Sequence, residues 1–139
     1  MQTLPKSDDT LVIRTDFSDD AEWENVCAMI REPVGEFRAY VEFVNDPVYD
    51  GLSIDQLPQL ISPETAPAVL FIVDHKTIYE PESVVLAVDV ASQASRTFRV
   101  TPSEMWSVEN NLSLANMDWE DFAACTDDKG VFRGFPYMD

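Results

Sequence analysis

The run from Ala68 to Val73, AVLFIV, is the feature that most limits how this chain can fold. Its six residues are all apolar, so a strand formed there would present apolar side chains to both faces of its sheet. Such a strand belongs at the centre of a sheet that is covered on both sides. We therefore predict an α/β or α+β fold in which helices pack on a single mixed sheet.

The N-terminal half predicts a strand, a helix and a second strand. Residues 10–15 (TLVIRT) are rich in β-branched residues, and Ser18 can cap a following helix that ends before Pro33 and Gly35. The second strand, 37–44, alternates apolar and polar residues. This order favours a right-handed parallel crossover. The apolar positions are Trp23, Val26, Cys27 and Ile30 in the helix and Phe37, Ala39, Val41 and Phe43 in the second strand.

The C-terminal half predicts an antiparallel meander followed by helices. Ser53 with Gln56 opens a short helix before the central strand, and residues 84–90 and 96–100 supply two further strands with short connections. Residues 101–122 have the clearest helix start: Thr101 and Glu104 can form a capping box around Pro102. The predicted order is β-α-β-(short α)-β-β-β-α-α with about five strands. Met105, Val108, Leu112 and Ala115 mark the inward stripe of the long helix, Asp118 or Asn116 caps the last one, and residues 131–135 form a tail.

Length and charge restrict the classes of function. The 139 residues fit a flexible leader (1–9) and a single globular domain (10–139), and the formal net charge is −17. The nine Lys and Arg residues are scattered, which argues against direct binding to nucleic-acid phosphates or an anionic membrane. A basic protein partner remains compatible with this charge, while the oligomeric state is left open.

No run of the sequence reaches the 18 apolar residues of a membrane span, residues 1–10 lack the apolar core expected of a signal peptide, and we recognise no cofactor motif. We expect a cytoplasmic protein without a cofactor. In that compartment Cys27 and Cys125, which lie on apolar sides of predicted helices, are expected to be reduced thiols.

Four aspartates offer an enzymatic alternative. Asp16 and Asp74 follow strands expected to be parallel, so their carboxylates could share one edge of the sheet, with Asp19 and Asp20 nearby. Carboxylates held at such an edge can bind Mg²⁺ and orient a phosphate. The competing interpretation is that these residues form caps and turns, because no glycine-rich phosphate loop accompanies them. His75 is the sole histidine, and on a continuing strand it would point away from Asp74.

The helical region from 101 to 122 also contains a candidate recognition surface. Two tryptophans flank an amide-rich turn, and aromatic anchors beside hydrogen-bonding amides are common in binding surfaces. The alternative is core packing combined with helix capping. The candidate binding residues are Trp106, Asn110, Asn111, Asn116 and Trp119.

Three segments resemble a bacterial domain family of unknown function. They are VIRTDFSDDAEW (12–23), IREPVGEFRAYVEFVNDP (30–47) and FRVTPSEMWSVENNLSLANMDWEDF (98–122). Because that family has no assigned activity, the resemblance implies no reaction and no site. From the charge, the leading prediction is a non-enzymatic acidic interaction module, such as an immunity-like or inhibitor protein. The alternative is a metal-dependent hydrolase or phosphoryl-handling enzyme that uses the four aspartates.

Overall fold

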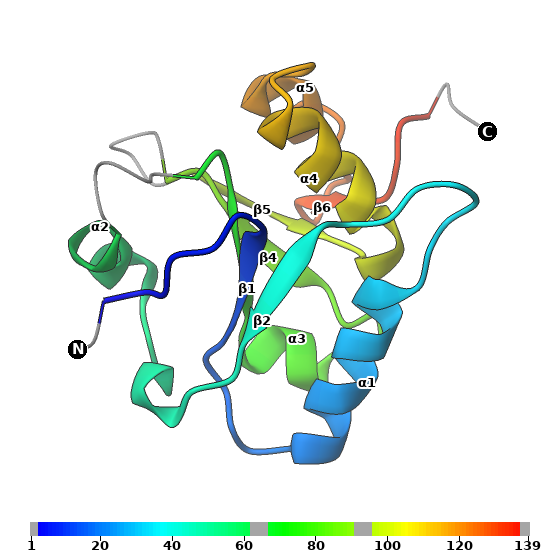
Figure 1. The fold of residues 1–139 in the computed structure, drawn as a ribbon. Helices are drawn as coiled ribbons and strands as arrows, with labels where there is room; N and C mark the ends of the chain where they lie inside the picture. The colour runs from blue at the N-terminus through cyan, green and yellow to red at the C-terminus, as the bar shows by residue number, and fades with distance from the viewer. Residues whose placement is uncertain (1–2, 62–66, 91–95, 137–139) are drawn as a thin grey trace.

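The computed structural model describes residues 3–61, 67–90 and 96–136, and it confirms a mixed α/β fold (Figure 1). A single six-stranded sheet has the order β2-β1-β3-β4-β5-β6. The strands are β1 (Thr10–Arg14), β2 (Val41–Val44), β3 (Leu70–Val73), β4 (Val85–Val88), β5 (Thr97–Val100) and β6 (Val131–Phe132). The helices are α1 (Asp20–Arg31), α2 (Leu57–Leu60), α3 (His75–Tyr79), α4 (Met105–Ser113) and α5 (Trp119–Ala123), with 3₁₀ turns η1 (Pro47–Tyr49), η2 (Ile54–Gln56) and η4 (Pro102–Glu104).

The sheet joins a parallel half to an antiparallel half. β1 pairs in parallel with β2 and β3, whereas β3, β4 and β5 form the predicted antiparallel meander. All four residues of β3 are buried, as expected for a strand with neighbours on both sides. β6, which the sequence analysis treated as part of a tail, pairs in parallel with β5 through two residues.

Each face of the sheet has its own hydrophobic cluster. One cluster joins α1, α4 and α5 to inward residues such as Val12 and Phe71. The other packs the segments around η1 and α2 against Ile13 and Ile72. Figure 1 shows α1 on one side of the sheet, with α2 and the N-terminal segment on the opposite side. Alternation along the strands thus assigns neighbouring residues to different clusters.

The segment expected to be a leader contacts the second cluster. Leu4 donates a backbone hydrogen bond to the Leu60 carbonyl at 2.9 Å, and the Tyr49 hydroxyl donates to the Thr3 carbonyl at 2.7 Å. Among the described residues, no helix is long and apolar enough to cross a membrane. Cys27 is buried, Cys125 is half-buried, and both are free thiols.

The second predicted strand is shorter than expected. β2 begins at Val41, and Phe37, predicted to be buried, is 51% exposed and bridges back to Val34. The positive φ of Gly35 (62°) allows this tight turn. In addition, β1 starts at Thr10, the partner of Val41, so it offers no earlier residue for pairing.

Two predicted helix starts are also corrected. Asp19, not Ser18, caps α1 by accepting a hydrogen bond from the Glu22 amide. The Thr101 side chain makes no cap hydrogen bond, and a 3₁₀ turn precedes α4. The Glu104 carboxylate instead lies beside Gly134, where an added Cβ would come within 3.1 Å of Oε1.

The expected stripe of α4 is likewise one residue too long. Met105, Val108 and Leu112 are buried, but Ala115 lies beyond the helix, with a φ of 56°, and is exposed. By contrast, the capping boxes at Ser53 with Gln56 and at Asp118 with Asp121 are present.

Candidate functional site

A hollow lies where the parallel strands β1 and β3 end. The connection that follows β1 crosses one face of the sheet through α1, and the connection that follows β2 crosses the other through η1, η2 and α2. In open α/β sheets, ligands bind at such a change of direction, outside the carboxyl ends of the strands. The hollow has a volume of about 580 Å³ and is lined by Thr15, Asp16, Phe17, Ser18, Asp50, Gly51, Leu52, Asp74 and His75.

Backbone hydrogen bonds hold the loops around the hollow. The Thr15 amide donates to the Val73 carbonyl at 3.0 Å, and the Gly51 amide donates to the Thr15 carbonyl at 2.9 Å. Gly51 has a φ of 75°, which a residue with a side chain adopts only with strain. The loops that follow β1, β2 and β3 therefore meet at one place.

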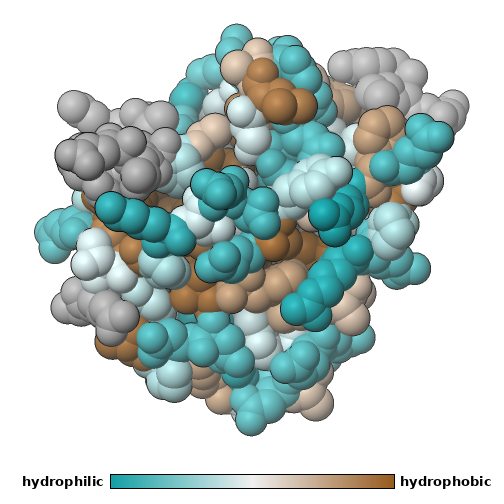
Figure 2. Space-filling view, viewed as in Figure 1, coloured by the Kyte–Doolittle hydropathy of each residue, from teal (hydrophilic) through white to brown (hydrophobic). Residues whose placement is uncertain are grey.

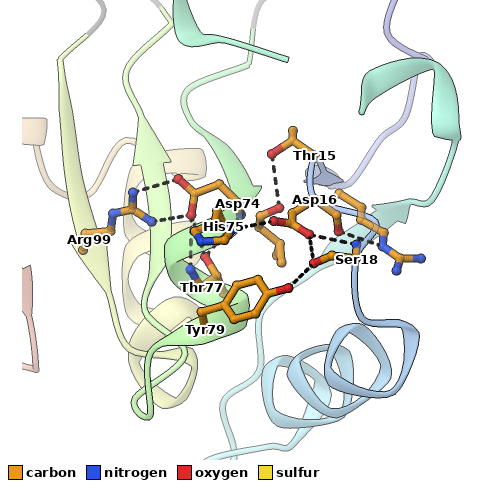
Figure 3. A network of polar contacts seen from close by, with 10 residues as sticks. Thr15, Asp16, Ser18, Asp74, His75, Thr77, Tyr79 and Arg99 are labelled. Atoms are coloured by element: carbon orange, nitrogen blue, oxygen red, sulfur yellow. Dashed lines mark hydrogen bonds and ion pairs between the residues drawn. The ribbon is translucent and has the colours of Figure 1, made fainter. Parts of the chain in front are cut away.

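Asp16 is the centre of a polar network in the hollow (Figure 3). Its Oδ1 accepts hydrogen bonds from the backbone amide and the hydroxyl of Ser18, and its Oδ2 lies 3.0 Å from His75 Nδ1. The Tyr79 hydroxyl donates to Ser18 Oγ at 2.7 Å. The rings of His75 and Tyr79 are 4.2 Å apart, so α3 supplies one side of the network.

The environment keeps Asp16 charged. Partial burial raises the pKa of its carboxyl, but the hydrogen bonds from Ser18 and the contact with His75 outweigh that effect, so the pKa lies below 3.8. The Asp16 side chain is 14% exposed, whereas the His75 side chain is 77% exposed. The network thus presents an anchored carboxylate beside an accessible imidazole.

The order of the three groups differs from that of a nucleophilic serine site. Such a site places an imidazole between the hydroxyl and the carboxylate. Here Asp16 stands between Ser18 and His75, and the Ser18 hydroxyl bonds directly to the carboxylate. This arrangement is suited to holding charge and hydrogen-bonding groups in place rather than to activating the serine.

Asp74 connects α3 to β5. Its carboxylate accepts hydrogen bonds from the backbone amide of Thr77 at 3.2 Å and from the Thr77 hydroxyl at 3.1 Å, which caps α3. The two terminal nitrogens of Arg99 donate to its two oxygens at 2.7 and 2.8 Å. Burial raises the pKa of Asp74, but the hydrogen bonds and positive charge of Arg99, with the Thr77 bonds, lower it below 3.8.

The structure brings two of the four candidate aspartates together. Asp16 and Asp74 line the same hollow, as the parallel arrangement predicted. Asp19 caps α1, and Asp20 pairs with the buried Arg14 at 2.7 Å. Within residues 3–61, 67–90 and 96–136, no group of three or more His, Cys, Asp or Glu side chains is arranged to hold a metal ion.

The two candidate tryptophans contact different segments. Trp119 is 7% exposed and packs on Phe98 of β5, with ring centroids 4.6 Å apart. Trp106 is half-buried and stacks on Phe37 at the same centroid distance, 4.6 Å. The Trp106 Nε1 is buried without a hydrogen-bond partner in the described part of the chain.

The candidate amides mainly support the local structure. Asn110 donates to the Arg38 carbonyl at 3.0 Å and to Glu109, and Asn111 donates to the Ser107 carbonyl at 2.9 Å. The buried Glu109 carboxylate also accepts a hydrogen bond from the Tyr40 amide at 2.7 Å. Asn116 is exposed beyond the end of α4.

Sequence reasoning missed His75, Tyr79 and Arg99 as members of the site. It placed His75 on a continuing strand, whereas the chain turns into α3 directly after Asp74, so the imidazole points toward Asp16. The signal was the Asp at 74 followed by Thr at 77, which is a helix-capping pair. Arg99 gave no local signal, because its contact with Asp74 joins positions distant in the sequence.

Comparison with known proteins identifies a family but no activity. A family model described as a domain of unknown function (DUF6924) matches residues 9–135. A search of curated proteins gives no match.

Proposed function

The chain belongs to this family of unknown function, and on that premise we propose that it is a non-enzymatic interaction module that binds a basic protein. The binding surface is the acidic edge, which we define as Asp16, Asp19, Asp20, Asp46 and Asp50. Asp16 and Asp19 lie in the loop that follows β1, Asp20 is the first residue of α1, and Asp46 and Asp50 lie in the segment that follows β2. The hollow at the carboxyl ends of the strands would receive a Lys or Arg side chain of the partner.

The observation that carries this proposal is the set of carboxylates that follow the parallel strands, two of which, Asp16 and Asp50, line the hollow. Asp19, Asp20 and Asp50 are exposed, and Asp16 keeps its negative charge at neutral pH because its pKa is lowered. Arg14, the basic residue closest in sequence to Asp16, Asp19 and Asp20, has a side chain that is only 4% exposed. Carboxylates arranged in this way attract a basic partner and fix its orientation.

The charge of the whole chain supports the same function. With a net charge of −17, the molecule attracts a basic protein over a distance set by the ionic strength, which increases the rate of encounter. The contact of Asp74 with Arg99 favours binding over the alternative of a metal-dependent hydrolase or phosphoryl-handling enzyme. That carboxylate already has a cationic partner within the chain and does not belong to the acidic edge.

The test compares two variants of equal net charge in capture experiments from native cell extract. The first carries Asp19→Asn, Asp46→Asn and Asp50→Asn. Asn keeps the helix caps that Asp19 and Asp46 supply, so the change is mainly one of charge. The control carries Glu24→Gln, Glu32→Gln and Asp128→Asn, which are exposed positions outside the acidic edge.

We expect the unaltered chain and the control to capture the same basic protein at low salt and to release it at high salt. The acidic-edge variant should capture at least tenfold less, because it has lost the specific charges. If both variants captured equally less of the basic protein, the binding would depend only on the total charge of the chain. The proposed site would then be wrong. Failure of the unaltered chain to retain any basic protein at low salt would contradict the function itself.

A further inference from the structure

The outer edge of β2 is open to another strand. β2 stands at one end of the sheet, and in the described part of the chain its sole strand partner is β1. The Cα partner of Thr10 in this pairing is Val41. The Thr10 amide, however, donates to the carbonyl of the preceding residue, Tyr40. In a parallel ladder a residue bonds to the two neighbours of its Cα partner. The N–H and C=O of Val41 therefore point away from β1.

Hydrophobic side chains are concentrated beside this open edge. Among the described residues, six large hydrophobic side chains are exposed, and three of them lie in residues 34–40: Val34 (41%), Phe37 (51%) and Tyr40 (50%). In Figure 2 the largely hydrophilic surface is interrupted near the centre by hydrophobic residues, in the part of the view where Figure 1 places β2. Three exposed large hydrophobic side chains within one short segment indicate a protein interface.

The charges along this edge are balanced, unlike those of the molecule. A hollow of about 530 Å³ borders β2, and its charged lining residues are Asp9, Arg31, Arg38 and Glu42. They contribute two positive and two negative charges, whereas the chain carries −17. Two copies of this chain would repel each other over most of their surfaces. The repulsion between two copies is smallest if they approach through the charge-balanced edge beside β2.

The sequence of the edge is complementary to itself. If residues 38–42 of two copies run antiparallel with Tyr40 opposite Tyr40, Arg38 of each copy lies opposite Glu42 of the other. Opposite charges directly across two strands stabilise the pairing. The same register sets the outward N–H and C=O of Val41 opposite Ala39 of the second copy, which would supply the matching groups if the pairing extends the strand to that residue. Arg38 and Glu42 are both exposed, and their present contacts are with the Tyr40 ring and the Ser7 hydroxyl.

We propose that this chain forms a two-fold symmetric homodimer in which residues 38–42 of the two copies pair antiparallel about Tyr40. The first residues of β2 in each copy then lie beside residues 38 and 39 of the other, which join the two sheets at this edge. Phe37, stacked on Trp106, borders the contact on each copy. The paired residues 38–42 include no member of the acidic edge, so different substitutions test the dimer and the proposed partner binding.

The mass in solution tests the dimer, and charge exchange tests its register. Sedimentation equilibrium over about 1 to 200 µM should give a mass twice the 15.7 kDa of the chain. Arg38→Glu and Glu42→Arg should each raise the dimer dissociation constant at least tenfold, because like charges then face each other. The double variant R38E/E42R should restore the dimer. Val41→Pro should weaken it as well, since proline removes an outward amide that β1 does not use.

Control variants make the same charge changes elsewhere. Lys129→Glu matches Arg38→Glu, and Glu24→Arg matches Glu42→Arg, and both controls should remain dimeric. Circular dichroism of every variant establishes that it is folded. A chain that stays monomeric at about 200 µM overturns the proposal. So does a dimer that survives Val41→Pro and both single reversals, and failure of the folded double variant to recover would overturn the proposed register.

Discussion

At the scale of single residues, Asp74 shows how the hollow is maintained. One carboxylate caps α3 and binds both terminal nitrogens of Arg99, so it joins the carboxyl end of β3 to β5. The side chains of Asp74 and Arg99 are 26% and 17% exposed. A partly buried ion pair of this kind is costly to break, because the remaining guanidinium would lose its partner without becoming fully hydrated. The geometry around His75 therefore depends on this pair.

We predict that Asp74→Asn destabilises the fold by about 1.5–3 kcal/mol at pH 7, the range for hydrogen bonds to charged groups. Asn retains the cap of α3, so the loss reports on the charge. The folded-state pKa of Asp74 lies below 3.8, so its contribution is present above that pH and is lost as the pH falls through the folded-state pKa. The difference in melting temperature between the unaltered chain and the variant should be constant near pH 7 and should become smaller below about pH 4. A difference in melting temperature that stays the same down to pH 3 would contradict this prediction. Asp128→Asn, at an exposed position, serves as the control.

At the scale of elements, α4 and α5 place their tryptophans in different environments. Trp119 is buried against Phe98, within an aromatic group that includes Phe122 and Phe132. Trp106 lies over the turn at Phe37 and is half-buried. The sequence could identify both as apolar members of helices, but it could not determine which strand or turn each ring would meet. For Trp106 the contact depends on where the second strand begins, because Phe37 lies in the turn before it.

We predict that Trp119→Ala destabilises the fold by about 3–5 kcal/mol, because it leaves a large cavity in the core. Trp106→Ala should have a smaller effect, about 1–2 kcal/mol, since much of its loss is one aromatic stack and partial burial. Urea unfolding of the two single variants measures both values. If Trp119→Ala were the milder change, the description of Trp119 as a core residue would be wrong.

At the scale of the molecule, element types were more predictable than their ends. The buried run at 70–73 and the apolar stripe of α1 predicted the central strand and its first covering helix because burial repeats with a fixed period. The first residue of β2 depended on where β1 begins. β6 depended on a pairing with β5, and a strand of two residues is too short to show a periodic pattern in the sequence. The meeting of Asp16 and Asp74 followed from parallel strands, whereas Arg99 required the full sheet order.

We predict that the melting temperature rises when NaCl is increased from low concentration to about 0.15 M, where the screening length is about 8 Å. The reason is that a net charge of −17 repels itself more strongly in the compact state than in the unfolded chain. Scanning calorimetry at fixed pH measures the shift. A monotonic fall would mean that screening of ion pairs, such as that of Arg133 with Glu82, outweighs relief of repulsion.

The alternation of β1 and β3 between two clusters divides the sheet's hydrophobic residues into independent sets. Val12 and Phe71 contact the layer of α1 and α4, while Ile13 and Ile72 contact the layer of α2. A volume change in one set is transmitted to the other chiefly through the backbone. A substitution that changes volume on one side of the sheet can therefore be compensated by a second substitution on that same side, while the residues of the opposite side stay as they are.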